Sequence, residues 1–308
     1  MVKLHTAESL VSLSRWYVRH APGSFGKAPL AAQYLNPYLR DHPRRRVTRS
    51  RLGASFAVET QDLIQRYIYM FGVWEPHLTC WLSRRLRPGD AFVDVGANIG
   101  YFSVLASRLV GEEGCVVAVE ASPAVHERGA AQARLNGCRN VRAVNTAVSD
   151  SPGALTFTLA SSRNIGANSI VSYDGPAESR FEIQAKPLPE VLTAVEIAAA
   201  RVIKVDVEGA EGSVVRGMVP LLDRLRPEAE IAIEVTPERM AQLGDSADEL
   251  LATMREYGFH TYRIANDYAA ASYPAALRRA PLAPVRWRGP VVGESDLIFS
   301  RVDAETLP

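Results

Sequence analysis

The stretch FVDVGANIGYFSVLA, residues 92–106, joins an apolar run to two glycines that stand four residues apart, Gly96 and Gly100. The apolar run predicts a buried strand, and the residues after Gly100 predict a helix. Glycine lacks a Cβ atom, so the backbone between the two elements can turn tightly and approach a ligand beside the free N–H groups of the helix. The stretch therefore predicts a strand, a ligand-binding turn and a helix of an α/β protein.

The same alternation continues along the chain. Four further apolar runs predict strands separated by amphipathic helices: CVVAVEA at 115–121, NVRAVNTAV at 140–148, RVIKVDV at 201–207 and AEIAIEV at 229–235. Alternating strands and helices form a mostly parallel sheet with helices on both faces. FHTYRIA at 259–265 and ESDLIFSR at 294–301 predict two last strands of this sheet.

Further elements are predicted between these strands, and the first of them interrupts the alternation. The turn DSPG at 150–153 predicts a hairpin between NTAVS and ALTFTLA, since proline and glycine set turn geometry between two strand-like runs. FEIQAKPL at 181–188 predicts one more strand. PEVLTAVEIAA at 189–199 and PERMAQLGDSADELLATMREYG at 237–258 each predict one helix.

Composition limits the classes of partner. With 308 residues and 47% hydrophobic content, the chain can bury a sizeable core in one large domain with an extension. The 35 basic and 34 acidic residues leave a net charge of +1, which favours neither a nucleic-acid nor a membrane partner. The three cysteines are too few for a structural zinc site, and the start of the chain has no signal-peptide pattern. We therefore expect a cytoplasmic protein.

Residues 1–74 predict an N-terminal helical extension, which could form a contact in a homo-oligomer. Its last part holds RDHPRRRVTRSR, from Arg40 to Arg51, with six arginines and one aspartate. Such a run is usually a solvated face, and a contact with an anionic substrate or a phosphate is the alternative.

The turn after the first strand has a partner at the end of the second. Glu120 stands twenty residues beyond Gly100, where an acidic side chain can bind both hydroxyls of a ribose. The spacing is not G-x-G-x-x-G, because Asn98 occupies the place of the middle glycine. The pattern predicts an adenosine-type ligand and disfavours a dinucleotide.

Four segments in order resemble FkbM-type S-adenosylmethionine-dependent methyltransferases: VDVGANIGYFSVLA, VVAVEASP, LNGCRNVRAVNTAVSD and VIKVDVEGAEGSVVRG, with GVWEPHL upstream. The resemblance covers about residues 70–265. It implies a class I methyltransferase fold, which is a seven-stranded, mostly parallel sheet with an antiparallel last strand. Residues 75–308 would form this domain, with the methyl donor across the carboxyl edge of the sheet.

The resemblance also implies the donor-binding residues. Asp94, Gly96, Asn98 and Gly100 would surround the methionine part of S-adenosylmethionine, and Glu120 would bind its ribose. The remaining implied donor-binding residues are Ala121 after Glu120, Asn145 to Ala147 beside the adenine, Glu75 from the preceding helix, and Asp206.

Carboxylates at the ends of later strands predict the chemistry. Methyl transfer needs mainly alignment, but an alcohol nucleophile benefits from a positioned base. Asp206 is the first candidate for that base, and Glu234 and Glu208 are the other two. Lys204 shares the sheet face of Asp206 and could depress its pKa. Asp206 and Glu234 could instead hold Mg²⁺, which prefers oxygen ligands but would lack a clear third one here.

The leading hypothesis is an O-methyltransferase that acts on a hydroxyl of a small natural product or a sugar. The alternatives are an NAD(P)-linked oxidoreductase and a non-catalytic subunit that binds S-adenosylmethionine. Residues 163–172 and the Pro-rich stretch from Tyr273 to Pro290 are candidate substrate-binding loops. Among the histidines, His77 and His260 are expected nearest the cleft, more as packed side chains than as bases.

Overall fold

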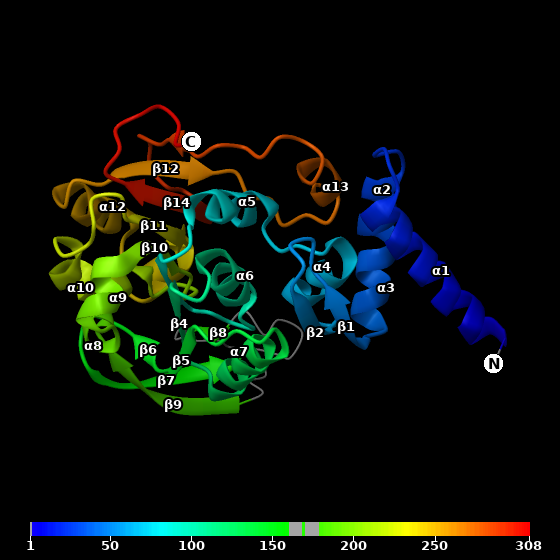
Figure 1. Ribbon diagram of the computed structural model, residues 1–308, viewed down its shortest axis with the longest axis horizontal. Coiled ribbons are helices and arrows are strands. Elements are labelled where there is room, and N and C mark those ends of the chain that lie inside the picture. The colour runs from blue at the N-terminus through cyan, green and yellow to red at the C-terminus, as the bar shows by residue number, and fades with distance from the viewer. Residues whose placement is uncertain (1, 160–167, 170–178) are drawn as a thin grey trace. The chain divides into compact units, whose positions relative to one another are not determined.

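The computed structural model describes residues 2–159, 168–169 and 179–308, which form two compact units (Figure 1). The first unit contains residues 2–80 and 266–281, and the second contains the other described residues. The first unit thus extends past residue 74 and includes a later segment of the chain. The candidate loop at 163–172 lies outside the described residues, apart from 168–169.

The second unit is built on an eight-stranded sheet, in the order β13-β12-β14-β11-β10-β3-β4-β5. Its strands are β3 Ala91–Val95, β4 Cys115–Glu120, β5 Val141–Asn145, β10 Ala200–Val205, β11 Glu230–Val235, β12 His260–Ile264, β13 Val285–Arg286 and β14 Ser295–Ser300. The five strands from β5 to β11 are parallel, and β14 is antiparallel to both of its neighbours. The predicted class I methyltransferase fold is confirmed.

The expectation of seven strands is one short. The eighth strand, β13, pairs with β12 at the edge of the sheet and is only two residues long. It lies in the Pro-rich stretch, between Pro284 and Pro290, where periodicity cannot be read over so few residues.

Helices cover this sheet in two groups, in which α6 contacts α7 and α10 contacts both α8 and α12. Their bounds are α6 Tyr101–Val110, α7 Pro123–Leu135, α8 Leu188–Val191, α9 Ala194–Ala199, α10 Glu211–Leu222, α11 Pro237–Gln242 and α12 Ala247–Glu256. Two predicted single helices are each broken in two. Thr193 forms a capping box with Glu196, which starts α9 as a new helix. Gly244, at φ +79°, ends the turn after α11.

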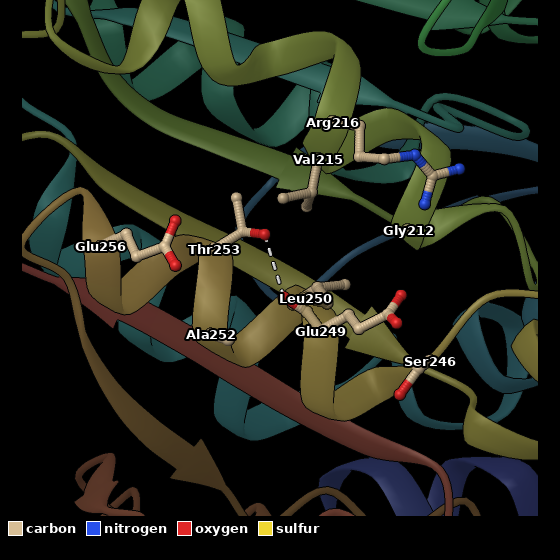
Figure 2. Close-up of a pocket in the computed structure, with 9 residues that line it drawn as sticks. All are labelled: Gly212, Val215, Arg216, Ser246, Glu249, Leu250, Ala252, Thr253 and Glu256. Carbon is tan, nitrogen blue, oxygen red and sulfur yellow. Dashed lines mark hydrogen bonds between the residues drawn. The ribbon is translucent and has the colours of Figure 1, made fainter.

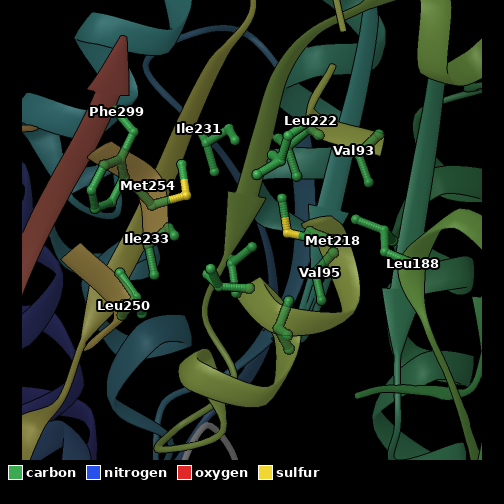
Figure 3. Close-up of a cluster of buried hydrophobic side chains, with 14 of the residues drawn as sticks. Val93, Val95, Leu188, Met218, Leu222, Ile231, Ile233, Leu250, Met254 and Phe299 are labelled. Carbon is green, nitrogen blue, oxygen red and sulfur yellow. The ribbon is translucent and has the colours of Figure 1, made fainter. Parts of the chain in front are cut away.

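Alternation along the strands separates the core from the site. Val93 and Val95 point into a core formed with Met218 and Leu222 of α10 (Figure 3). Ile231 and Ile233 of β11 enter the same core, with Leu250 and Met254 of α12 (Figure 3). Because side chains alternate across a strand, Asp94 and Lys204 project from the other face of the sheet, the face of α6. Burial of each large apolar side chain contributes about 1.5–3 kcal/mol.

A second, four-stranded sheet follows β5, in the order β6-β9-β7-β8. Its strands are β6 Ala147–Val148, β7 Gly153–Leu159, β8 Asn168–Ser169 and β9 Ser179–Lys186. The predicted hairpin across DSPG is wrong, because β9 lies between β6 and β7 and pairs with both. The hydroxyl of Thr146 also donates to the carbonyl of Gln184, which fixes the start of β6 on β9. A later strand thus takes the place that the turn suggested for β7.

The first unit combines helices with a hairpin that the sequence did not reveal. Its elements are α1 Val2–His20, α2 Lys27–Pro29, the π-helix η1 Leu30–Leu35, α3 Asn36–Asp41, β1 Arg45–Arg49, β2 Ser55–Glu59, α4 Leu63–Phe71 and α13 Tyr273–Ala276. Strands β1 and β2 pair antiparallel within the region expected to be helical. The hairpin was missed because the arginine run hides the alternation of apolar and polar residues in β1. Helix α5, Pro76–Arg85, begins in the first unit and ends in the second. Among the described residues, no helix is both long and apolar enough to cross a membrane.

Candidate functional site

The turn after β3 is held by backbone from both neighbouring strands. The N–H groups of Gly96 and Ala97 both donate to the carbonyl of Val119 in β4, at 2.9 Å. On the other side, the N–H of Asp206 donates to the carbonyl of Val95 at 3.0 Å. Gly96 has φ +78°, and a Cβ atom there would overlap the carbonyl of Asp206. Glycine is therefore required at this position by the end of β10 as well as by the turn itself.

Gly100 and Gly129 form a second close approach, between the turn and α7. A Cβ atom on Gly100 would lie 3.2 Å from the carbonyl oxygen of Gly129, and one on Gly129 would lie 3.0 Å from that of Asn98. Backbone thus packs on backbone here, so the sequence-based expectation that the glycines admit a ligand is incomplete. Gly129 was missed, and its signal was a glycine inside the helical run ERGAAQA.

Glu120 closes the turn from the end of β4. Its two carboxylate oxygens accept the N–H groups of Asn98 and Ser122, each at 2.9 Å. Burial raises the pKa of Glu120 to about 7 against these two hydrogen bonds, and the nearby charges of Asp206 and Asp94 act in the same direction as burial. Asn98 has φ +51°, a left-handed conformation that is uncommon outside glycine and concentrates at functional sites. Each oxygen of Glu120 keeps a second lone pair for a ligand hydroxyl.

Asp94 and Lys204 are register partners on β3 and β10, so their side chains share one face of the sheet. The hydroxyl of Ser103 in α6 donates to Asp94 Oδ2 at 2.5 Å. Asp94 Oδ1 is buried and has no hydrogen-bond partner among the described residues. Burial raises the pKa of Asp94, while the Lys204 ammonium opposes that change. The result is a buried polar layer with one unused acceptor.

Asp206 stands directly after β10, beside this layer. Lys204 Nζ lies 2.8 Å from Asp206 Oδ2, and the Asp206 side chain is 26% exposed. Burial alone would raise the pKa of Asp206, but Lys204 and a hydrogen bond with Glu234 together lower it below its ordinary value. A hydrogen bond between two carboxyl groups requires one proton, and the lowered pKa makes Asp206 the acceptor. Asp206 is therefore an ionised, partly exposed hydrogen-bond acceptor.

Two more glutamates follow Asp206: Glu208 in the segment before α10, and Glu211 as the first residue of α10. Glu208, at φ +57°, forms an ion pair with Arg239 of α11. Glu211 is fully buried, and its carboxylate accepts the N–H of Gly209 at 2.8 Å and the hydroxyl of Thr236 at 3.1 Å. Burial raises the pKa of Glu211 to about 7. Glu211 thus joins the segment after β10 to the segment after β11, a role that its position near a helix N-terminus did not indicate.

The last residue of β5 and the residues after it complete the edge of the sheet. The side-chain amide of Asn145 donates to the carbonyls of Glu120 and Ala121, at 2.8 and 3.0 Å. Ala121 packs against Ala147 and Ala185 in a small cluster. These predicted residues therefore lie together with the turn after β3.

Glu75 and His260 are two further predicted positions. Glu75 belongs to the first unit, where the hydroxyl of Tyr268 donates to its Oε1 at 3.5 Å. His260 begins β12, at the amino end of the sheet, and its Nδ1 lies 2.6 Å from Arg286 Nη2. The expectation that His260 lies near the cleft is wrong, because β12 runs in the same direction as β11 and its carboxyl end is Ile264.

Asp296 was missed as a residue of this edge. It is the second residue of the antiparallel strand β14 and the register partner of Glu234. Because β14 is antiparallel to β11, its amino end lies beside the carboxyl ends of the parallel strands. The acid in ESDLIFSR was visible, but its end of the strand was not assigned to the site.

Cavities near these elements differ in character. A cavity of about 20 Å³ lies against Asn98, Gly100, Glu120, His126 and Gly129. A larger one, of about 330 Å³, lies between α10 and α12, with Arg216 on one side and Glu249 and Glu256 on the other (Figure 2). Arg216 is held by Asp150 at 2.9 Å and Asp245 at 2.6 Å. The cavity of Figure 2 therefore belongs to the helical face rather than to the strand ends.

The strand-end residues fit the expected methyl donor. Asp94 offers a buried, unused acceptor, and Glu120 offers lone pairs at the position where a ribose is expected. A metal ion fits less well. Oxygens of Asp206, Glu208 and Glu234 lie within 4.8 Å of one another. Asp206 and Glu208, however, are already paired with Lys204 and Arg239, which compete with a cation for the same oxygens.

The comparison with protein families decides the assignment. The model of the methyltransferase FkbM domain matches residues 94–261, which span β3 to β12 and hold every strand-end residue described above except Asp296. The chain belongs to this family. It is thus a member of the FkbM-type, S-adenosylmethionine-dependent methyltransferases, as the sequence motifs predicted.

Individual relatives are more distant. Over 55 residues the chain is 46% identical to the 23S rRNA (uracil(1939)-C(5))-methyltransferase RlmD of Psychrobacter arcticus, which covers 18% of this chain and 11% of that protein. Over 68 residues it is 34% identical to the protein-L-isoaspartate O-methyltransferase of Ignicoccus hospitalis, covering 21% of this chain and 32% of that protein. The chain therefore matches less than a third of the length of each curated relative.

Among solved structures, the chain is similar to a methyltransferase FkbM from Methylobacillus flagellatus. The TM-score is 0.41 at 14% identity, over 77% of this chain and 52% of that one.

Proposed function

We propose that this FkbM family member transfers a methyl group from S-adenosylmethionine to a hydroxyl of a small molecule, a natural product or a sugar. The observation that carries the proposal is Asp206, an ionised and partly exposed carboxylate at the end of β10. Its backbone carbonyl faces Gly96 of the glycine turn, and its side chain is hydrogen-bonded to Glu234. An acceptor for a hydroxyl proton thus stands beside the expected donor site.

The strand-end residues have separate roles in the proposed reaction. Asp94 and Glu120 would hold the donor, whose sulfonium supplies an activated methyl group. Asp206 would accept the hydrogen bond of the substrate hydroxyl and take its proton as the new O–C bond forms and the S–C bond of the donor breaks, which leaves S-adenosylhomocysteine. Lys204 holds Asp206 ionised, which favours orientation of the hydroxyl over strong basicity. Glu234 positions Asp206 through their hydrogen bond.

Donor binding is the first experiment. Purified protein would be titrated calorimetrically with S-adenosylmethionine, S-adenosylhomocysteine, NAD and NADP. We expect the first two to bind and the nicotinamide nucleotides not to bind. Binding of NAD or NADP alone would reverse the assignment in favour of the oxidoreductase alternative.

Transfer of a labelled methyl group to a panel of hydroxylated small molecules tests the reaction. Asp206→Asn should retain donor affinity within about twofold and lower turnover by about 100-fold or more, because it removes the proton acceptor. The matched control is Asp223→Asn, at an exposed aspartate that caps α10 and should leave both unchanged. Full turnover in Asp206→Asn would exclude this residue as the acceptor, and methylation of RNA or protein alone would exclude the small-molecule substrate.

The metal alternative has its own measurement. Exhaustive treatment with EDTA should leave turnover unchanged, since Lys204 and Arg239 already neutralise two of the three carboxylates. Loss of turnover that Mg²⁺ restores would instead assign the three carboxylates to a metal ion.

A further inference from the structure

A cavity of about 240 Å³ in the first unit is lined by basic side chains from three separate segments of the chain. Arg19 and His20 come from the end of α1, Lys27 from α2, Arg51 from the turn after β1, and Arg278 from the segment after α13. These five residues define the basic pocket. Its other lining residues are apolar or glycine, and no acidic residue is among them.

Neutral groups hold these cations in place. Arg51 donates from Nε to the carbonyl of Phe71 at 3.0 Å and from Nη2 to that of Arg19 at 2.9 Å. Arg19 donates to the carbonyls of Tyr69 and Arg49.

Lys27 and Arg278 complete the pocket in contrasting ways. Lys27 is only 4% exposed, and its ammonium donates to the carbonyl of Ala21. The Arg278 guanidinium makes no hydrogen bond or ion pair in the part of the chain that the structure describes. The cations are thus oriented without being neutralised, although buried cations are normally paired with acids.

Burial and mutual repulsion lower the pKa values of Arg19 and Lys27. Burial, followed by the charges of Arg15 and Arg51, lowers the pKa of Arg19 to about 10. Burial and then the charges of Arg278 and Arg51 lower the pKa of Lys27. Bringing these positive charges together therefore costs free energy in the folded unit, and a bound anion would lower that cost.

We propose that the basic pocket binds a phosphate-type oxyanion of a small molecule. The guanidinium fork of Arg278 suits the paired oxygens of a phosphate, and Arg19, Arg51 and Lys27 add positive charge around the same cavity. Several cations around one cavity match the multiple charge of a phosphate or diphosphate better than the single charge of a carboxylate. The cavity is smaller than most pockets for drug-sized ligands, which favours a phosphate group with at most a small organic part.

The pocket also answers the question that the arginine run raised. Of the six arginines from Arg40 to Arg51, only Arg51 lines the pocket. Arg45, Arg46 and Arg49 lie exposed on β1, as expected of a solvated face. The run therefore provides a solvated face on β1 and, at Arg51, one residue of the proposed phosphate site.

The test is calorimetric titration of the full-length protein with inorganic phosphate, pyrophosphate and glucose 6-phosphate, in low salt. Arg278→Glu should weaken binding about tenfold or more, the effect of losing a charged hydrogen bond. Because Arg278 is exposed and unpaired in the described structure, this variant should fold normally. The matched control is Arg279→Glu, an exposed neighbour that does not line the pocket and should bind as the wild type does.

A second readout is the imidazole of His20, followed by NMR. Burial lowers the pKa of His20 below its ordinary value. The neighbouring charges of Arg19, Arg15, Arg51 and Lys27 lower it further. Bound pyrophosphate should raise this pKa in the wild type and in Arg279→Glu, but much less in Arg278→Glu.

The outcomes are distinct. Tighter binding of glucose 6-phosphate than of inorganic phosphate supports a phosphorylated metabolite, and equal binding supports the free oxyanion. Equal weakening by Arg278→Glu and Arg279→Glu, or no saturable binding of any of the three probes, would overturn the proposal. Binding of S-adenosylmethionine should be unchanged in both variants, so the result is independent of the proposed methyl transfer.

Discussion

The requirement for glycine at position 96 depends on a residue that comes much later in the chain, Asp206. The pattern of an apolar run ending in glycine predicted a tight turn, which the structure contains at φ +78°. The same pattern could not predict that the carbonyl of Asp206 occupies the space of a Cβ atom. The requirement for glycine depends on how β3 and β10 pair, and pairing is a property of the folded chain.

Gly96→Ala should therefore destabilise the protein more than the loss of glycine alone explains. Gly244→Ala is the matched control, because Gly244 has φ +79° and no atom within 4 Å of its Cβ position. We expect the control to cost about 1 kcal/mol from left-handed strain. Gly96→Ala should cost about 3 kcal/mol or more, measured by urea unfolding of both variants. Equal costs would show that the Asp206 carbonyl moves aside easily.

Glu211 predicts a pH dependence of stability. Its folded pKa is about 7, above its ordinary value of 4.5, so the folded state keeps a proton that the unfolded state has lost. The free energy of unfolding therefore falls as pH rises from about 4.5 to about 7, by up to about 3 kcal/mol for this group. Glu211→Gln keeps an acceptor for Gly209 and can donate to Thr236.

This variant should match the wild type near pH 4.5 and exceed its stability near pH 8. Urea unfolding at both pH values measures the difference. A constant difference between the variant and the wild type at the two pH values would contradict the raised pKa.

At the scale of single residues, the sequence predicted which acids end strands but not what they touch. Glu120, Asp206 and Glu234 were identified because parallel strands bring their carboxyl ends to one edge. The ion pair of Glu208 with Arg239 depends on the angle of a short helix, and no local pattern encodes it. Gly129 and Asp296 are visible in the sequence, but they were missed because their contacts with the turn and with Glu234 depend on how distant elements pack.

At the scale of elements, a buried ion cluster joins the amino ends of β10 and β11 to α5. Glu230 Oε2 lies 2.7 Å from Arg85 Nε and 3.1 Å from Arg201 Nη1. The Glu230 side chain is 4% exposed, so its removal leaves two largely buried guanidinium groups without their carboxylate.

Glu230→Ala should lower the free energy of unfolding by about 3–5 kcal/mol, since breaking a buried pair from one side leaves uncompensated charge. Glu228→Ala serves as the control, because Glu228 forms its ion pair with Arg226 at the surface and should change little. Thermal unfolding of the two variants compares them directly. Similar small losses in both would mean that water reaches the cluster.

The element scale is also where the sequence was most informative. Strands with strong apolar runs were placed correctly, and the antiparallel last strand followed from the family resemblance. Errors arose where local signals were weak or where a distant strand intervened. Thr193 and Gly244 broke helices that periodicity alone would continue, and β9 displaced the expected hairpin partner of β7.

At the scale of the whole molecule, the homo-oligomer through the N-terminal extension stays a prediction. Helix α1 exposes Leu10, Leu13 and Trp16 at 56%, 63% and 56%, at a spacing that places them on one face. If a second copy covers this face, Leu13→Glu should shift the protein to a monomer in sedimentation equilibrium. Leu282→Glu is the control, because Leu282 is similarly exposed outside α1. If the wild-type protein is a monomer at all concentrations, the prediction of a homo-oligomer is wrong.

The composition of the first unit has a consequence for synthesis on the ribosome. Tyr273 packs against Tyr67 and Phe71, and Tyr268 stacks on Trp74, yet these partners are translated about two hundred residues apart. The aromatic side chains of α4 therefore lack these partners while the strands of the sheet from β3 to β12 are translated. The first unit begins with the segment that emerges first, but it is completed only when residues 266–281 have been translated. A chaperone therefore has most reason to bind the nascent chain at α4.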